Sequence, residues 1–441
     1  MHIFRIKTPF YMKHLIILLL LLQGGQQASA QLNHTDRAQL IEAFGRALIE
    51  GYIHAGPALQ MSTYISEQLK AGSYDTLADP EVFVRRVSED LRSISKDLHL
   101  SVFYSPTVLP EYNGFRTQIS GEEKKRMQTE LVKDNYGLEK AEVLAGNIGY
   151  LDFRYFAPLE FSGDTYAGAF RQLEDVDALI LDLRNNHGSM SDQVIPFLCG
   201  YLFSSSVHLN SIYFKQKEFT QQYWSSEYVP SKKLSEVPVY VLISGKTFSG
   251  GEELAYDLQA LKRATLVGHP TAGGANPVAP VKVNAHYGIN LPQALVINPV
   301  TKTNWEGVGV QADTIVLPSL ALETAHRLAL KKLISENAVT ERANLVNLLE
   351  NMEASAIPLQ AYTFTLEGYP TASEVYLSGS FNNWAMKANA MVREKETWSV
   401  SLLLPRGIHE YKFIVDGRWI TDPGNLQAGD TAGTSNSILR L

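Results

Sequence analysis

The stretch "VPVYVLISGKTFSGGEELAYDLQALK", residues 237–262, places a short apolar run, a turn and a second apolar pattern in succession. The first run predicts a buried strand, and the apolar residues after the turn recur at helical spacing. The turn itself holds Ser249, followed by two glycines. A serine in this place is either an ordinary helix cap or a nucleophile exposed at the tip of a strand.

The same alternation of strand and helix extends to both sides of this stretch. "GNIGYLDFRYF" (146–156), "DALILDLRN" (177–185) and "ATLVG" (264–268) read as strands, with helical patterns between them. Such alternation predicts βαβ units and a mostly parallel sheet. In sheets of this kind, chemistry gathers in the loops after the carboxyl ends of the strands, and "DLRNNHGS" and "ISGKTFSGG" are two such loops.

The rest of the chain divides by its periodicity. Apolar residues at helical spacing fill much of the stretch before the sheet, and a period of two begins near residue 359. We therefore expect a signal peptide, a helical domain, an α/β domain, a helical linker and a small β-sandwich, at 1–30, 31–98, 99–335, 336–358 and 359–441, respectively.

The first 30 residues have the order of a secretory signal. Basic residues precede "LIILLLLL" (15–22), which is too short for a comfortable membrane span, and "ASA" (28–30) fits a cleavage site. We expect cleavage after Ala30 and export to a periplasm or the cell exterior, without a membrane-spanning helix.

Composition excludes several classes of function. The net charge of −7 argues against a nucleic-acid partner, because such proteins carry a basic face. The one cysteine, Cys199, cannot form an intrachain disulfide. Neither a zinc-protease helix motif nor a Cys/His cluster is present, so we expect no metal and no other cofactor.

Four ordered segments carry a resemblance to a known family: "ALILDLRNNHGS", "VYVLISGKTFSGGEELAYDLQ", "ATLVGHPTAGG" and "NWEGVGVQAD". Together they resemble the serine peptidases of the C-terminal processing (tail-specific) group, and within it the tricorn-core and interphotoreceptor retinoid-binding protein branch. The resemblance implies a crotonase-like α/β spiral that hydrolyses peptides or proteins.

The resemblance also implies a role for five residues. Ser249 matches the nucleophile, His99 the base, and Glu306 the acid that orients the base. The N–H groups of Gly188 and Gly250 match the oxyanion donors.

Two positions separate this chain from parts of the family. The tail-specific enzymes place a lysine base in the turn that reads "TAGGA" (271–275) here, where Gly274 takes its position. Tricorn-type sites have a serine just before the histidine, where this chain has Leu98, so either Asp97 or Glu306 is expected to orient His99.

Other polar residues near these motifs have competing interpretations. His187 and His269 are weaker candidates for the base and candidates for contacts with substrate. Glu252 and Glu253 are expected in a first helical turn, where their negative charges are stabilised by the positive end of the helix dipole.

The last segment resembles the glycogen-binding module of AMP-activated protein kinase β subunits, through "GSFNNW", "HEYKFIVDG" and the W-x-x-D-P pattern. The resemblance implies an immunoglobulin-like sandwich that binds an α-glucan, because indole rings stack on sugars while amides and ammonium groups bind hydroxyls. The implied contact residues are Trp384, Lys412, Trp419 and Asn436. In the alternative, both tryptophans only fill a small core.

The sequence therefore predicts an exported serine peptidase with a glucan-binding module. Two alternatives stay open: a non-catalytic binding protein on the same fold, and an esterase that acts on acylated sugars.

Overall fold

The computed structural model describes residues 31–112, 120–336, 339–425, 428–431 and 434–441. The expected signal peptide lies outside the described residues. The chain divides into two compact units. Of the described residues, the smaller contains 31–95, 100–112 and Val278–Leu291, and the larger contains Lys96–His99 and those of 120–277 and 292–441.

Helices dominate the smaller unit, as the sequence predicts. They are α1 (His34–Gly51), α2 (Ala55–Lys70) and α3 (Pro80–Ser95), and three strands join them in the order β1 (Ser101–Tyr104), β10 (Tyr287–Pro292) and β9 (Val278–Lys282). Strand β10 contributes Ile289 and Leu291 to the same apolar core as Phe44 and Val87. This burial explains why the unit takes in a segment from 278 to 291, which the expected boundary at residue 98 leaves out.

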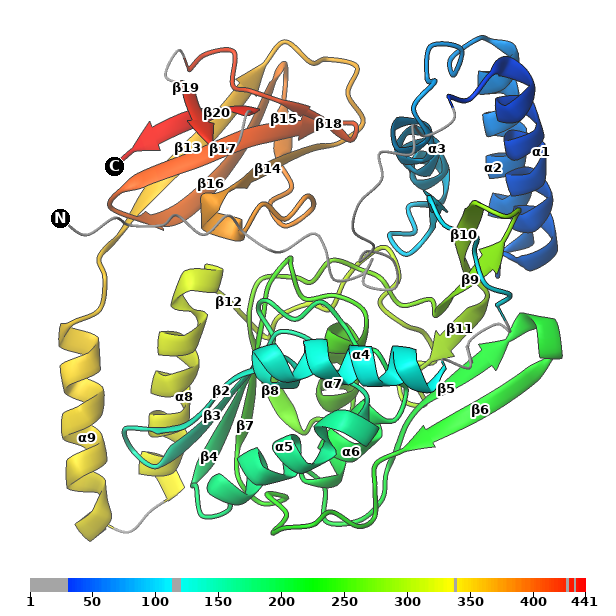
Figure 1. The fold of residues 1–441 in the computed structure, drawn as a ribbon. Helices are drawn as coiled ribbons and strands as arrows, with labels where there is room; N and C mark the ends of the chain where they lie inside the picture. The colour runs from blue at the N-terminus through cyan, green and yellow to red at the C-terminus, as the bar shows by residue number, and fades with distance from the viewer. Residues whose placement is uncertain (1–30, 113–119, 337–338, 426–427, 432–433) are drawn as a thin grey trace, which may run out of the picture. The chain divides into compact units, whose positions relative to one another are not determined.

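A six-stranded sheet forms the centre of the larger unit (Figure 1). Its order is β12 (Thr314–Ile315), β8 (Ala264–Gly268), β7 (Val239–Ile243), β4 (Ala178–Asp182), β3 (Ile148–Phe153) and β2 (Leu138–Leu144). All neighbours pair in parallel except β2 and β3. The predicted, mostly parallel sheet is confirmed, with β2 added as an antiparallel edge.

Helices cover both faces of this sheet (Figure 1). Successive side chains of a strand point to opposite faces, so Leu179 and Leu181 join one core cluster while Ala178 and Ile180 join the other. Residues of α5 (Leu159–Gln172), α6 (Val194–Gly200) and α7 (Gly250–Ala260) pack in the first cluster. Residues of α8 (Ala321–Glu336) and α9 (Val339–Ala354) pack in the second.

Further elements of the larger unit surround the sheet. A three-stranded sheet, which the sequence did not predict, has the order β11 (Ala294–Ile297), β5 (His208–Phe214) and β6 (Phe219–Trp224). The remaining helices are α4 (Gly121–Leu131) and the short η2 (Val132–Gly137), η3 (Lys215–Lys217) and η4 (Pro318–Leu320).

The C-terminal part is rich in strands, as its period of two predicts. One sheet has the order β13 (Leu359–Glu367), β16 (Thr397–Pro405) and β15 (Val392–Glu394). The other has the order β14 (Val375–Gly379), β17 (Ile408–Val415), β20 (Thr434–Arg440) and β19 (Ala428–Thr431), with β18 (Arg418–Ile420) beside β17. The short helix η5 (Ser380–Asn382) follows β14. Aromatic and aliphatic side chains from both sheets share one core cluster.

None of the helices in the described part of the chain combines the length and the apolar character that crossing a bilayer requires.

Candidate active site

Three neighbouring strands of the sheet end beside one another and supply the loops of the site. Strands β4, β7 and β8 pair in parallel, so their carboxyl ends meet at one edge. Hydrogen bonds tie the first two loops together: Thr247 Oγ1 donates to Leu183 O at 2.7 Å, and Phe248 N donates to Asn186 O at 3.0 Å. The two residues before Ser249 are therefore held by the loop that follows β4.

Ser249 has an unusual backbone conformation at the junction between this loop and α7. Its φ of 53° and ψ of −121° lie in a region that residues other than glycine rarely adopt. Helix α7 begins at the next residue, Gly250. A sharp turn of this kind is what presents a nucleophile at a strand end.

His99 lies next to this serine. Its Nε2 atom is 3.1 Å from Ser249 Oγ, and its side chain is 8% exposed. The backbone N–H of His99 donates to Asp97 Oδ1 at 3.0 Å, and its ring lies against the Phe248 ring at a centroid distance of 4.5 Å. The sequence-predicted nucleophile and base are thus within hydrogen-bonding distance.

Two carboxylates lie close to the imidazole. Among the described residues, Asp97, His99 and Glu306 form a group in which one ligand atom of each lies within 4.8 Å of the other two. Glu306 Oε2 accepts the N–H groups of Ala275 and Asn276 at 2.6 and 3.0 Å, and the side-chain amide of Asn276 donates to Asp97 at 3.3 Å. Burial, and then the neighbouring Asp97, raise the pKa of Glu306. This group has the atoms to hold a divalent cation, and it also has the arrangement that orients a catalytic base.

This chain has Leu98, not a serine, before His99, and the imidazole has two acidic neighbours. Leu98 is 39% exposed, whereas Asp97 is 1% exposed. Asp97 and Glu306 both lie close to the imidazole, and which of them orients it stays a prediction.

Gly274 explains why a lysine has no room in this site. A Cβ atom on Gly274 would lie 2.2 Å from Phe248 Cε2 and 2.9 Å from His99 Cε1. Real Cβ atoms essentially never come within 3.0 Å of such atoms. The rings of His99 and Phe248 thus occupy the space that a side chain at 274 would need, so the histidine and a lysine at this turn exclude each other.

Gly188 and Gly250 both lie against the nucleophile loop. A Cβ on Gly188 would be 2.9 Å from Ser249 Cβ, and its φ of +116° favours glycine. However, the Gly188 N–H donates to Asn186 Oδ1 at 2.9 Å, so in this conformation it is not a free oxyanion donor. Gly250 is the first residue of α7, where N–H groups have no partner within the helix.

Glu252 lies in the first turn of α7, as expected, but it makes more contacts than a helix-end acid needs. It is fully buried, and its carboxylate accepts the N–H groups of Ser249 (2.8 Å), Gly273 (2.6 Å) and Gly274 (2.9 Å) and the hydroxyl of Thr271 (2.5 Å). Glu252 therefore has buried hydrogen-bond partners besides the helix end. The side chain connects the nucleophile loop to the turn beside His99. The S-x-x-E spacing from Ser249 to Glu252 is a signal that could have indicated this contact.

Glu253 and the two weaker histidine candidates make other contacts. The carboxylate of Glu253 accepts the Asn210 amide at 2.8 Å, and burial raises its pKa to about 7. The His269 backbone N–H donates to Ile243 O, and burial lowers the pKa of its ring. The His187 backbone N–H donates to Arg154 O. The hydroxyl of Ser249 has His99 as its histidine neighbour.

Two of the predicted glucan contacts, Trp384 and Trp419, lie next to each other in the C-terminal domain. The ring centroids of Trp384 and Trp419 are 6.2 Å apart, and Trp419 is 40% exposed. Lys412 lies on β17, one residue after Tyr411, and the Asn436 amide donates to Glu410 at 2.9 Å. The two indoles are not core residues of this domain, because its core is built from other side chains.

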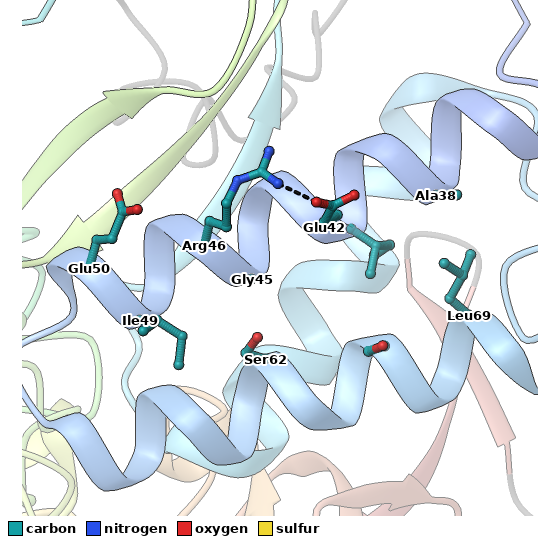
Figure 2. A pocket seen from close by; sticks show the side chains of 10 residues that line it. Ala38, Glu42, Gly45, Arg46, Ile49, Glu50, Ser62 and Leu69 are labelled. Atoms are coloured by element: carbon teal, nitrogen blue, oxygen red, sulfur yellow. Dashed lines mark hydrogen bonds and ion pairs between the residues drawn. The ribbon is translucent and has the colours of Figure 1, made fainter.

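A groove of about 510 Å³ between α1 and α2 contains none of these residues (Figure 2). It is lined at its rim by the ion pair between Glu42 and Arg46, and the helices come close at Gly45 and Ser62. The residues that line this groove do not include a histidine beside a serine, so the loops around Ser249 remain the candidate site.

The loops around Ser249 lie within a range that matches a known family. Residues 147–316 match the model of peptidase family S41, and residues 362–441 match that of the glycogen recognition site of AMP-activated protein kinase. The human 5'-AMP-activated protein kinase subunit beta-2 is 34% identical over 97 residues, which cover 22% of this chain and 35% of that protein. The pig beta-1 subunit is 44% identical over 68 residues, which cover 15% and 54%. The chain thus spans about a third to a half of these relatives.

Solved structures give further likenesses. A protein from Parabacteroides merdae described as a candidate peptidase aligns with a TM-score of 0.49 and 18% identity, over 68% of this chain and 99% of that one. Mature CPAF aligns with a TM-score of 0.48 and 11% identity, over 72% and 98%.

The recognition made from the four motifs and from the C-terminal strands is confirmed by the two matched models. The chain carries a domain of peptidase family S41, followed by a glycogen-recognition module of the AMP-activated protein kinase type.

Proposed function

We propose that this chain is an exported serine peptidase in which Ser249 is the nucleophile and His99 the general base. The single observation that carries the proposal is the 3.1 Å contact between Ser249 Oγ and His99 Nε2, with Asp97 and Glu306 beside the imidazole. The arrangement supplies a nucleophile, a base and an orienting acid, which is the set that acyl transfer requires.

In the proposed reaction, His99 takes the proton of Ser249 as Oγ attacks a peptide carbonyl. The oxyanion is stabilised by the N–H of Gly250 and, once it leaves Asn186, by the N–H of Gly188. The imidazolium then protonates the leaving amine, and water hydrolyses the acyl-enzyme with His99 again as base. The acidic pair beside the ring stabilises the imidazolium.

The finer features of fold and location belong to the same proposal. A crotonase-like spiral and an immunoglobulin-like sandwich fit the strand orders described above. A mature chain that begins at Gln31 fits the order of charged, apolar and small residues before it. Mass spectrometry of the protein secreted or exported by its host tests the last point, and an intact Met1 refutes it.

The module is proposed to bind an α-glucan through Trp384, Trp419, Lys412 and Asn436. The adjacent, partly exposed indoles support this role, because an indole ring can stack on the apolar face of a glucose unit.

A fluorophosphonate probe tests the catalytic proposal directly. The wild-type protein is expected to be labelled at Ser249 and to hydrolyse casein, while Ser249→Ala and His99→Ala lose both, by a factor on the order of 10⁴ in kcat. Ser206→Ala, which removes a hydroxyl outside the site, serves as the matched control. Unchanged hydrolysis by Ser249→Ala would refute the mechanism.

Two other functions are separated by the same experiment. A non-catalytic binding protein is indicated if Ser249 is not labelled. An esterase is indicated if labelled protein hydrolyses acetylated malto-oligosaccharides but not casein.

A further inference from the structure

We propose that the glucan-binding module is docked against the loops of the active site, and that proteins held on an α-glucan are therefore substrates of the peptidase. The inference rests on the proposed function. The module and the active site belong to the same compact unit of the chain, and three separate contacts join them.

The first contact is made by the nucleophile loop itself. A Cβ on Gly245 would lie 2.1 Å from Ala385 Cβ and 3.0 Å from Ala385 Cα. The bare backbone of Gly245 therefore touches Ala385, which is 7% exposed. Gly245 precedes Ser249 by four residues, and Ala385 directly follows the glucan-binding Trp384.

The second contact reaches the loop of the orienting acid. The ammonium group of Lys387 donates to Gly307 O at 3.4 Å, and Gly307 directly follows Glu306. The Gly307 N–H in turn donates to Gly273 O at 2.9 Å, in the turn that excludes the lysine.

The third contact is apolar and supports the other two. Leu317 and Leu320, at η4, pack in the core cluster of the module with Phe381. Arg184, in the loop that leads to Gly188, donates to Pro318 O at 2.6 Å. The module therefore packs on η4, and Arg184 joins η4 by a hydrogen bond to the loop of the predicted oxyanion site.

The module loop that makes these contacts has a well-defined conformation. Asn383 and Trp384 have φ values of 58° and 61°, and the Trp384 N–H donates to Gly379 O at 2.9 Å. Asn382 accepts the Gly379 N–H and donates to Leu377 O, at 2.9 and 3.1 Å. The indole of Trp384 is thus placed by the same turn that presses Ala385 against Gly245.

These contacts set an upper limit to the distance between the two sites. From Ser249 to Gly245 the chain advances at most about 15 Å, and about 8 Å more covers the Gly245–Ala385 contact and the step to Trp384. The Cα atoms of Trp384 and Ser249 are therefore within about 23 Å, a span that about seven extended residues cover. A protein that displays a loop or terminus beside a bound glucan chain can occupy both sites at once.

Simultaneous occupation raises the local concentration of the scissile segment. Linked binding sites give effective concentrations in the millimolar range when the link matches the span. Proteins attached to, or adsorbed on, an α-glucan should then be cleaved faster than the same proteins in free solution whenever substrate is below its KM.

The test compares two forms of one protein substrate with the full chain. Fluorescein-casein is conjugated at its lysines with maltoheptaose by reductive amination, and a second batch is conjugated identically with cellohexaose, which has the opposite glycosidic linkage. We expect kcat/KM to be at least tenfold higher for the maltoheptaose conjugate. Saturating free maltoheptaose should remove the difference without slowing cleavage of the cellohexaose conjugate.

A change in the interface tests the docking itself. Ala385→Glu places a charge against Gly245 and should abolish most of the advantage, measured within this variant as the ratio of kcat/KM for the two conjugates. Met386→Glu is the matched control, because the neighbouring Met386 is 44% exposed and should keep the advantage. Lys387→Met, which removes only the contact with Gly307, is a milder variant that avoids a misfolded module.

The outcomes separate this inference from the proposed function. Equal cleavage of the two conjugates overturns the inference and leaves the peptidase intact. An advantage that Ala385→Glu retains overturns the docking. Cleavage of neither conjugate refutes the proposed peptidase and this inference with it.

Discussion

Replacing Gly274 by alanine tests whether the rings of His99 and Phe248 fill the space beside the nucleophile. The φ of Gly274 lies outside the left-handed region, so the backbone accepts an alanine and only the new methyl group acts. That methyl would lie 2.2 Å from Phe248 Cε2 and 2.9 Å from His99 Cε1.

The size of the effect follows from these distances. To reach an ordinary contact of about 3.4 Å, the Phe248 ring must retreat by about 1.2 Å and the His99 ring by about 0.5 Å. A retreat of His99 by about 0.5 Å lengthens its 3.1 Å contact with Ser249 to at most about 3.6 Å, which is too long for a hydrogen bond. Misplacement on this scale costs about 10²-fold in rate, and overpacking costs about 1–3 kcal/mol of stability.

The assay measures both quantities on the same protein. The rate of fluorophosphonate labelling of Ser249 is expected to fall about 10²-fold, and urea unfolding should show the loss of stability. Gly149→Ala is the matched control: its Cβ would lie 3.2 Å from Leu179 and Val176, in the core of the sheet. It should lower stability while the folded protein keeps its labelling rate.

A second variant locates the cause in the ring contact. Adding Phe248→Leu to Gly274→Ala removes the atoms that the methyl group meets and should recover part of the labelling rate. If folded Gly274→Ala is labelled at the wild-type rate, the argument that the rings leave no room at this position is refuted.

Three further predictions concern stability, pH and binding. Arg184→Met leaves the buried Asp182 carboxylate without its guanidinium partner and should lower the free energy of unfolding in urea by about 3–5 kcal/mol. Burial raises the pKa of Glu252 to about 7, so its contribution to stability is complete below the unfolded-state pKa of about 4.3 and is lost as pH rises through 7. The free energy of unfolding of the wild type relative to Glu252→Gln should therefore fall by about 2 to 3 kcal/mol between pH 5 and 8 in urea titrations. Trp419→Ala should lose binding to glycogen in a pull-down, while Trp224→Ala, which removes a similarly exposed indole, keeps it.

Each of these has a result that contradicts it. An unchanged urea midpoint for Arg184→Met means that the ion pair adds nothing to stability. A difference between the wild type and Glu252→Gln that does not vary with pH means that the carboxyl titrates in the folded protein as in the unfolded chain. Retention of Trp419→Ala on glycogen removes this indole from the binding site.

Much of the fold could be predicted because its signals are local. The apolar runs at 178–182, 239–243 and 264–268 are each short and continuous, as buried parallel strands require. Strand β11 was missed because its pairing depends on a partner far away in sequence: Ala294–Ile297 pairs with β5 rather than with a neighbour in the chain. Strands β5 and β6 pair with each other as neighbours, but they are partly exposed and have no continuous buried run to mark them. Strand β2 was missed for a related reason, since as an exposed edge strand it lacks the continuous apolar run.

The site was only partly predictable for the same reason. The motifs pointed to Ser249, His99 and Glu306, and the fold brings them together. The burial of Glu252 was not visible, because an acid in a first helical turn is commonly exposed and only its neighbours at 271–274 enclose it. Nor did the motif reveal that Asn186 accepts the Gly188 N–H.

By itself the sequence determined the alternation of strands and helices that builds the parallel sheet and the two domain types, because spacing and residue type are properties of the chain alone. Its resemblance to a known family indicated the candidate site residues. The tertiary structure decided which carboxylates reach His99, why no lysine fits at 274, and that Ala385 meets Gly245. Those facts are distances between atoms far apart in sequence, and they exist only once packing has closed the loops between them.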